Sequence, residues 1–268
     1  MTEPNQEWQA PPLPEEPQLV EEKEVAQMSE IATLGNIFLE PGRTFEDLRR
    51  QPRFIFGMLI MVVLITGFAF LFQQRMGEER YRRSFAEMIE KNPQAGQMSP
   101  EQKKAQIEMQ VTISKYSAFI VPVVMFIVFF VGGLIYWLGG KAMGGTMSYL
   151  HGLSVWVYSS FPITVVSILA NILVLYLKSP DDIDIAASQR GLVNANPTMF
   201  FDGKEMPVLT TLISTIDVFA IWGLILAAIG LRIVGKISSG SAWAIVLILS
   251  LVGVTFRVVG ALLSGAPS

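Results

Sequence analysis

The chain has no cysteine and a single histidine, His151, among its 268 residues. The missing cysteines exclude disulfides, thiolate nucleophiles and cysteine-ligated metals, and one histidine excludes a histidine cluster. We therefore expect neither a metal site nor a cofactor. Charged residues are also scarce, at 16% of the chain against roughly 25% in an average soluble domain. The net charge of −3 lacks the basic excess of a nucleic-acid binder, so we expect no nucleic-acid partner.

Long apolar runs take the place of the missing charges. Hydrophobic residues make up 51% of the chain. A membrane helix needs roughly 20 apolar residues to cross about 30 Å of hydrocarbon. Five runs approach or exceed this length: 54–72, 117–138, 152–177, 208–231 and 242–264. The sequence therefore predicts an all-α, polytopic membrane protein with a five-transmembrane-helix bundle over residues 54–264.

Two different segments precede the first span. Residues 1–28 are rich in Pro and Glu and cannot bury enough apolar surface to fold, so we expect a disordered acidic, proline-rich tail. Residues 29–53 carry apolar side chains at helical spacing, interrupted by Pro41-Gly42, which predicts two short amphipathic interfacial helices. Four arginines form a basic flank next to the first span: Arg43, Arg49, Arg50 and Arg53. Such a flank favours the membrane surface and a cytoplasmic N-terminus.

A polar hairpin separates the first two spans. Residues 73–116 hold eight Lys or Arg and six Glu. Ser99, Pro100 and Gln102 are the residue types of an N-cap, a first helical residue and a capping-box partner, so we expect a helix that runs from Pro100 into the second span. The mixed charges are typical of an exposed helix face, and a recognition element is the alternative.

Prolines and glycines inside the spans predict local features. Pro122 and Pro162 predict helix kinks, and a broken helix of the transporter kind is the alternative. Glycines at 132 and 133, and Gly223 with Gly230, predict close approach between helices.

Two ionisable residues fall inside the apolar runs, Asp217 in the fourth and Arg257 in the fifth. Charges in a span usually face the bundle interior and find a partner there. Because consecutive spans are antiparallel, both charges and Asn171 of the third span fall in the same leaflet. We therefore expect Asp217 and Arg257 to pair, with Asn171 beside them. The cluster is either a pocket for a lipid headgroup, an ion or a proton, or a structural pair that locks two helices.

His151 lies three residues before Ser154, which raises the alternative of an intramembrane hydrolase. No GxSxG elbow or acidic partner accompanies the two residues, so this alternative requires them to meet in a cavity.

Three segments resemble the Yip1 domain family, above all its bacterial members: FLEPGRTFEDLRRQPRF, SYLHGLSVWVYSSFPITV and VLTTLISTIDVFAIWGLILAAIGL. The similarity covers residues 36–264. It implies five membrane helices and an N-terminus in the cytosol. In eukaryotic relatives it also implies vesicle traffic with prenylated small GTPases, a role that depends on machinery of which this sequence gives no sign.

Together these features indicate a non-enzymatic scaffold or membrane-organising factor in the bacterial inner membrane. We expect membrane lipids as partners, and a protein partner or a second copy of the chain in addition. A small transporter or lipid-handling protein that uses the polar cluster is the alternative function.

Overall fold

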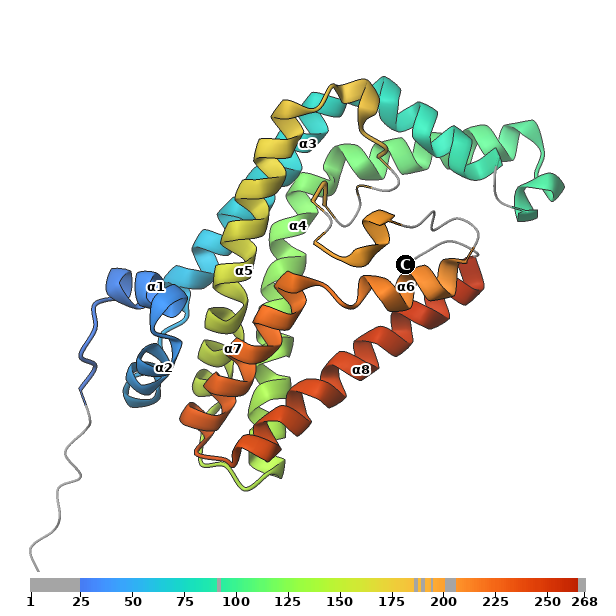
Figure 1. The fold of residues 1–268 in the computed structure, drawn as a ribbon. Helices are drawn as coiled ribbons and strands as arrows, with labels where there is room; N and C mark the ends of the chain where they lie inside the picture. Colours follow the sequence, from blue (N-terminus) through green and yellow to red (C-terminus); the bar gives the residue numbers. More distant parts are fainter. Residues whose placement is uncertain are drawn as a thin grey trace, which may run out of the picture.

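The computed structural model describes residues 25–90, 93–185, 188, 191–193, 195–200 and 206–264. Most of the predicted disordered tail, residues 1–24, lies outside the described residues. The described part is helical and contains no strand. Its α-helices, shown in Figure 1, are α1 (Glu30–Leu39), α2 (Pro41–Arg50), α3 (Ile55–Glu90), α4 (Pro100–Ala142), α5 (Tyr149–Leu177), α6 (Pro207–Ser214), α7 (Val218–Gly235) and α8 (Ser239–Ser264). Short 3₁₀ turns occupy Pro93–Gln97, Pro180–Asp182 and Pro197–Phe200.

Five of these helices, α3, α4, α5, α7 and α8, are long and apolar enough to cross a membrane. Most apolar side chains on them point outward, as a lipid-facing surface requires. The predicted all-α membrane bundle is therefore confirmed. The bundle has two ends. The α2 end carries α2 and the α4–α5 and α7–α8 connections, and the arm end carries the α3–α4 connection and α6 (Figure 1).

The fourth span is shorter than the sequence predicts and is shifted along the chain. The apolar run 208–231 is not one helix, because α6 ends at Ser214 and α7 begins only at Val218. The interruption at residues 215–217 is called the junction below. The second and third spans, by contrast, continue as helices through Pro122 and Pro162.

Glycines allow α4 and α5 to touch along their backbones. A Cβ atom on Gly133 would lie 2.7 Å from the Leu153 Cα, and one on Gly152 would lie 2.6 Å from the Gly133 carbonyl oxygen. A Cβ on Gly132 would overlap the Trp156 indole ring. The predicted close approach at residues 132 and 133 is confirmed.

The amphipathic helices α1 and α2 pack against the bundle as well as facing outward. Ile37, Phe45 and Leu48 are fully buried. The Phe45 ring fills a slot between α5 and α7, where a Cβ on Gly230 would lie 2.8 Å from both Phe45 Cε1 and Val155 Cγ1. The missing side chain at Gly230 therefore leaves the space on α7 into which Phe45 of α2 packs.

One arginine of the predicted basic flank forms an internal ion pair rather than facing the membrane surface. Arg53 forms an ion pair with Asp47, and their side chains are 12% and 2% exposed. Arg53 Nη1 also donates to the Met28 carbonyl oxygen over 2.6 Å, and Asp47 Oδ1 accepts from the Gln27 and Met28 amides. Asp47 and Arg53 thus fasten residues 27 and 28 to α2. Arg43 is exposed and pairs with Glu40, while Arg49 and Arg50 are half-buried.

The polar hairpin forms a helical arm. Gly77 has φ 70° and ψ 161°, a conformation that favours glycine, and it interrupts the regular helix of α3. Beyond it, residues 78–90 of α3 run beside residues 100–116 of α4, and these two segments are called the arm. The predicted start of α4 is confirmed, because Ser99 and Gln102 form a capping box in front of Pro100. Figure 1 shows the arm running sideways from the bundle.

Ion pairs fix the arm to itself and to the end of α5. Arg82 bonds both Glu78 and Glu108, and Arg80 lies 2.7 Å from the Asp181 carboxylate. The hydrogen bond from Arg80 lowers the pKa of the Asp181 carboxyl. The Arg80 to Asp181 contact is therefore complete above the ordinary aspartate range and is lost as the pH falls through the lowered pKa.

We predict that Gly230→Ala destabilises the protein although alanine is the better helix former. The added methyl group meets Phe45 and Val155, and overpacking of this kind costs about 1–3 kcal/mol. Gly253→Ala is the matched control, because a Cβ at Gly253 has no neighbour within 4 Å. Thermal unfolding of both variants in one detergent measures the difference. Equal melting temperatures would contradict the described fit of α2 against α7.

Candidate functional site

Asp217 caps a helix instead of standing in the middle of one. It is the N-cap of α7, and its Oδ1 accepts hydrogen bonds from the Phe219 and Ala220 amides at 2.9 and 3.1 Å. A carboxylate at this position also interacts favourably with the helix dipole. Its Oδ2 lies 3.5 Å from Asn196 Nδ2. Asp217 therefore fixes the point at which the fourth span begins.

Arg257 reaches the other side of the same junction. Its Nη2 donates to the Ser214 hydroxyl over 3.0 Å, and Ser214 in turn donates to the Thr211 carbonyl oxygen. Asp217 precedes the end of α7 at Gly235 by eighteen positions, and Arg257 follows the start of α8 at Ser239 by eighteen. At 1.5 Å per residue, both lie about 27 Å along their helices from the α2 end. The two charges thus lie at similar distances along their helices from the α2 end.

The predicted ion pair between Asp217 and Arg257 is wrong. Both residues belong to the described part of the chain, and no ion pair joins them there. Asp217 is engaged by backbone amides, and Arg257 contacts the serine that ends α6. Because α7 starts at Val218, the carboxylate stands at a helix start and needs no arginine to hold its charge.

Asn171 holds a loop rather than a charge. The residue is buried in α5, donates to the Ser167 carbonyl oxygen over 2.7 Å, and accepts from the Leu192 and Val193 amides. This loop then continues to the junction, where the Ala195 carbonyl oxygen accepts from the Val218 amide over 3.2 Å. Asn171 and Asp217 therefore fasten the same connection, one at the third span and one at the fourth.

The first turn of α7 has a protein acceptor for each of its first three amides. Val218 donates to Ala195, and Phe219 and Ala220 donate to Asp217. A helix start that lacks such partners costs free energy in an apolar surrounding. Asp217 and Arg257 thus hold the two helix ends at the interrupted span, and Asn171 holds the loop that leads to it.

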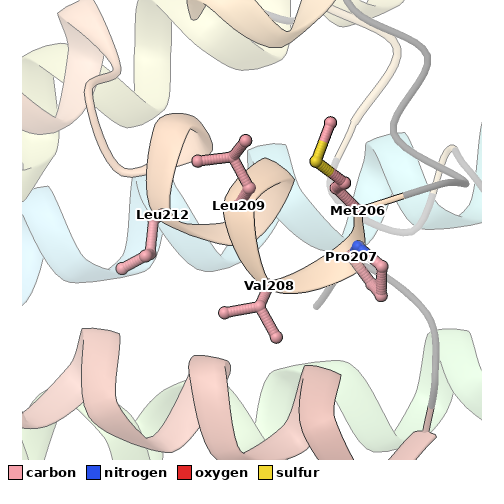
Figure 2. A pocket seen from close by; sticks show the side chains of 5 residues that line it. All are labelled: Met206, Pro207, Val208, Leu209 and Leu212. Atoms are coloured by element: carbon pink, nitrogen blue, oxygen red, sulfur yellow. The ribbon is translucent and has the colours of Figure 1, made fainter.

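Two cavities lie near this region, and neither is lined by Asp217, Arg257 or Asn171. The first has a volume of about 420 Å³ and is lined by apolar side chains of α6 and the residue before it, including Met206, Leu209 and Leu212 (Figure 2). The second, of about 340 Å³, lies between the arm and the end of α5 and is lined by Arg80, Arg83 and the acidic residues 181, 182 and 184 among others. Among the residues that the structure describes, the first of these cavities is an open depression with an apolar lining.

His151 and Ser154 do not form a dyad. His151 Nδ1 lies 2.7 Å from the Ser148 hydroxyl, and His151 Nε2 lies 3.0 Å from the Arg49 carbonyl oxygen. Ser154 is buried and donates to the Leu150 carbonyl oxygen. His151 therefore ties the start of α5 to the end of α2, and the hydrolase alternative loses its basis.

The buried pair of Asp47 and Arg53 is the polar feature that the sequence reasoning missed. A signal for it exists: Asp47 lies between Phe45 and Leu48 on the amphipathic segment, so a face that buries these two side chains brings the carboxylate inward. A buried carboxylate requires a cation, and Arg53 follows within six residues.

These features define a helical integral membrane protein whose polar residues hold its own loops and helix ends. The chain belongs to the Yip1 domain family, whose model matches residues 35–261. It is similar to the membrane protein YknW of Bacillus subtilis (strain 168), with 27% identity over 233 residues that cover 87% of this chain and 91% of YknW. No solved structure matches the chain at a significant level.

We predict that Asp217→Ala destabilises the protein by about 1 kcal/mol, the usual cost of a lost N-cap. Asp217→Asn keeps the capping oxygen and is expected to stay close to the unsubstituted protein. Thermal unfolding of the three proteins in one detergent checks both statements. If Asn destabilises as strongly as Ala, the negative charge has a role that capping does not explain.

Proposed function

We propose that this protein is a non-enzymatic membrane scaffold that binds a lipid or protein partner and organises its surroundings in the membrane. The observation that carries the proposal is the use of the polar residues in the spans. Asn171, Asp217 and Arg257 each contact the protein's own backbone or hydroxyl groups. A substrate path needs polar groups directed at a ligand, whereas a scaffold needs them to fix its shape.

The shape of the outer surface also supports a scaffold. The bundle carries a large lipid-facing surface and an arm that ion pairs hold to the end of α5. Because the arm is fixed at both its base and its middle, little conformational entropy is lost when a partner binds to its surface. Membership of the Yip1 domain family agrees with a membrane role and names no reaction.

A small transporter or lipid-handling protein is the second candidate, and the junction favours it. Interrupted membrane helices in transporters expose helix ends that bind substrates or ions. Here the start of α7 is filled by Asp217 and the end of α6 is contacted by Arg257. A transport cycle would have to open these bonds.

A vesicle experiment separates the two candidates. The purified chain is reconstituted into liposomes with a fluorescent lipid, and scrambling is followed by chemical quenching of the outer leaflet. We predict that the unsubstituted protein and an Asp217→Asn, Arg257→Gln double variant both scramble lipid only at the background rate of the liposomes. A partner that co-purifies with the unsubstituted protein is expected to co-purify with the double variant as well. Thr255→Val is the control, since Thr255 on α8 is exposed and its hydroxyl donates to the Leu251 carbonyl oxygen of the same helix. Scrambling that the double variant abolishes and the control keeps would favour lipid handling.

We further propose the bacterial inner membrane as the location, with the α2 end in the cytoplasm. Arg43, Lys141, Arg232 and Lys236 lie at this end, close to the ends of spans, and support it through the positive-inside rule.

Two single cysteines test the orientation, and the chain has no other cysteine to react. Lys141→Cys lies at the α2 end and Lys104→Cys lies on the arm, and both side chains are exposed. We predict that a membrane-impermeant maleimide labels residue 104 on intact cells and residue 141 only after permeabilisation. The reverse pattern would place the arm in the cytoplasm.

A further inference from the structure

The α4 half of the arm carries an exposed apolar stripe beyond the predicted span. Met109, Ile113 and Tyr116 are 55%, 51% and 54% exposed. Their spacing of four and three residues places them on one face of the helix. On the opposite face, Val111 and Ala118 are buried. The stripe therefore points away from the rest of the arm.

This stripe continues the lipid-facing surface of the same helix. Ile120, Val123 and Ile127 follow Tyr116 at the same helical spacing and are also exposed, inside the predicted second span. From Met109 to Leu138 the exposed apolar face runs over 29 helical steps, or about 44 Å at 1.5 Å per residue. The hydrocarbon layer is only about 30 Å thick. The excess lies on the arm, which leaves the direction of the bundle (Figure 1).

Charged residues lie on one flank of the helix, away from the stripe. Lys104, Glu108 and Lys115 are exposed and lie about 100–140° around the helix from Met109, and Glu108 pairs there with Arg82 of the α3 half. Tyr116 stands where the stripe meets the predicted end of the span. A tyrosine at the headgroup level, and charged residues on the side of the helix away from the apolar face, are typical of a helix at a membrane interface.

We infer that the α4 half of the arm lies on the membrane surface, with Met109, Ile113 and Tyr116 inserted at the boundary between headgroups and acyl chains. The inserted face lies about 5–10 Å into this boundary, as in other interfacial helices. The charged flank and the α3 half of the arm, which meet at the pair of Arg82 and Glu108, face the water side.

The stripe fits lipid better than it fits a second protein. The stripe has no boundary with the lipid-facing surface of α4, so the same medium that covers Ile120 and Val123 reaches Tyr116, Ile113 and Met109 without a gap. A protein partner would need a separate surface with its own polar rim.

Nitroxide scanning of the full chain in nanodiscs tests the inference. Single cysteines replace Met109, Ile113 and Tyr116 on the stripe and Lys104 and Lys115 on the flank, all of them exposed positions whose replacement leaves the helix packing intact. The nanodiscs contain phosphatidylcholine and phosphatidylglycerol. Collisions with oxygen, which concentrates in lipid, are compared with collisions with a water-soluble nickel complex.

The expected result is an alternating pattern along the helix. The ratio of oxygen to nickel collisions is several-fold higher at 109, 113 and 116 than at 104 and 115, although residue 115 is closer to the span than residue 109. A ratio that falls steadily from 116 to 104 on both faces would overturn the inference and place the arm upright in water. Low accessibility to both reagents along the stripe would also overturn it and indicate a covering protein.

Discussion

The interrupted fourth span is the constraint on which the arrangement of the arm end depends. A helix that starts at the edge of the hydrocarbon layer exposes backbone amides, and lipid cannot satisfy them. Asp217 and the Ala195 carbonyl oxygen accept from the first three amides of α7. Because Ala195 belongs to a long connection, that connection must itself be held, and Asn171 does this from α5. Arg257 completes the arrangement by contacting Ser214, where α6 ends.

The α2 end is closed by different means. Here the constraint is packing, since Phe45 enters the slot at Gly230 and the buried pair of Asp47 and Arg53 fastens the chain before α1. His151 adds a bond from α5 to the end of α2. Both ends thus use their polar residues for internal contacts. In the described part, the lipid-facing helices, the apolar depression beside α6 and the arm remain exposed, which agrees with the scaffold proposed above.

Much of the fold follows from the sequence, because five long apolar runs leave a membrane chain few alternatives. The capping box at Ser99 was predictable because it depends on residues next to each other in the chain, and the close contact at Gly133 was predictable because glycines are typical of membrane helix interfaces. Hydropathy did not predict the junction. Because α6 and α7 are both apolar, the mean hydropathy over a span-length window stays high across Thr215 and Asp217. The ion pair of Arg53 with Asp47 was missed because counting charges treats every arginine near a span alike and does not consider that Asp47 lies on the buried face of α2.

The central claim is that the polar residues of the arm end form their hydrogen bonds within the protein rather than with water or a ligand. Hydrogen exchange of the full chain in nanodiscs, read at the amides of residues 192, 193 and 218–220, tests it most directly. The account predicts slow exchange in the unsubstituted protein, with Asn171→Ala raising the rate at 192 and 193 and Asp217→Ala raising it at 219 and 220. Fast exchange at these amides before any substitution would contradict the account, because it would mean that water already fills this region as in a transport pathway.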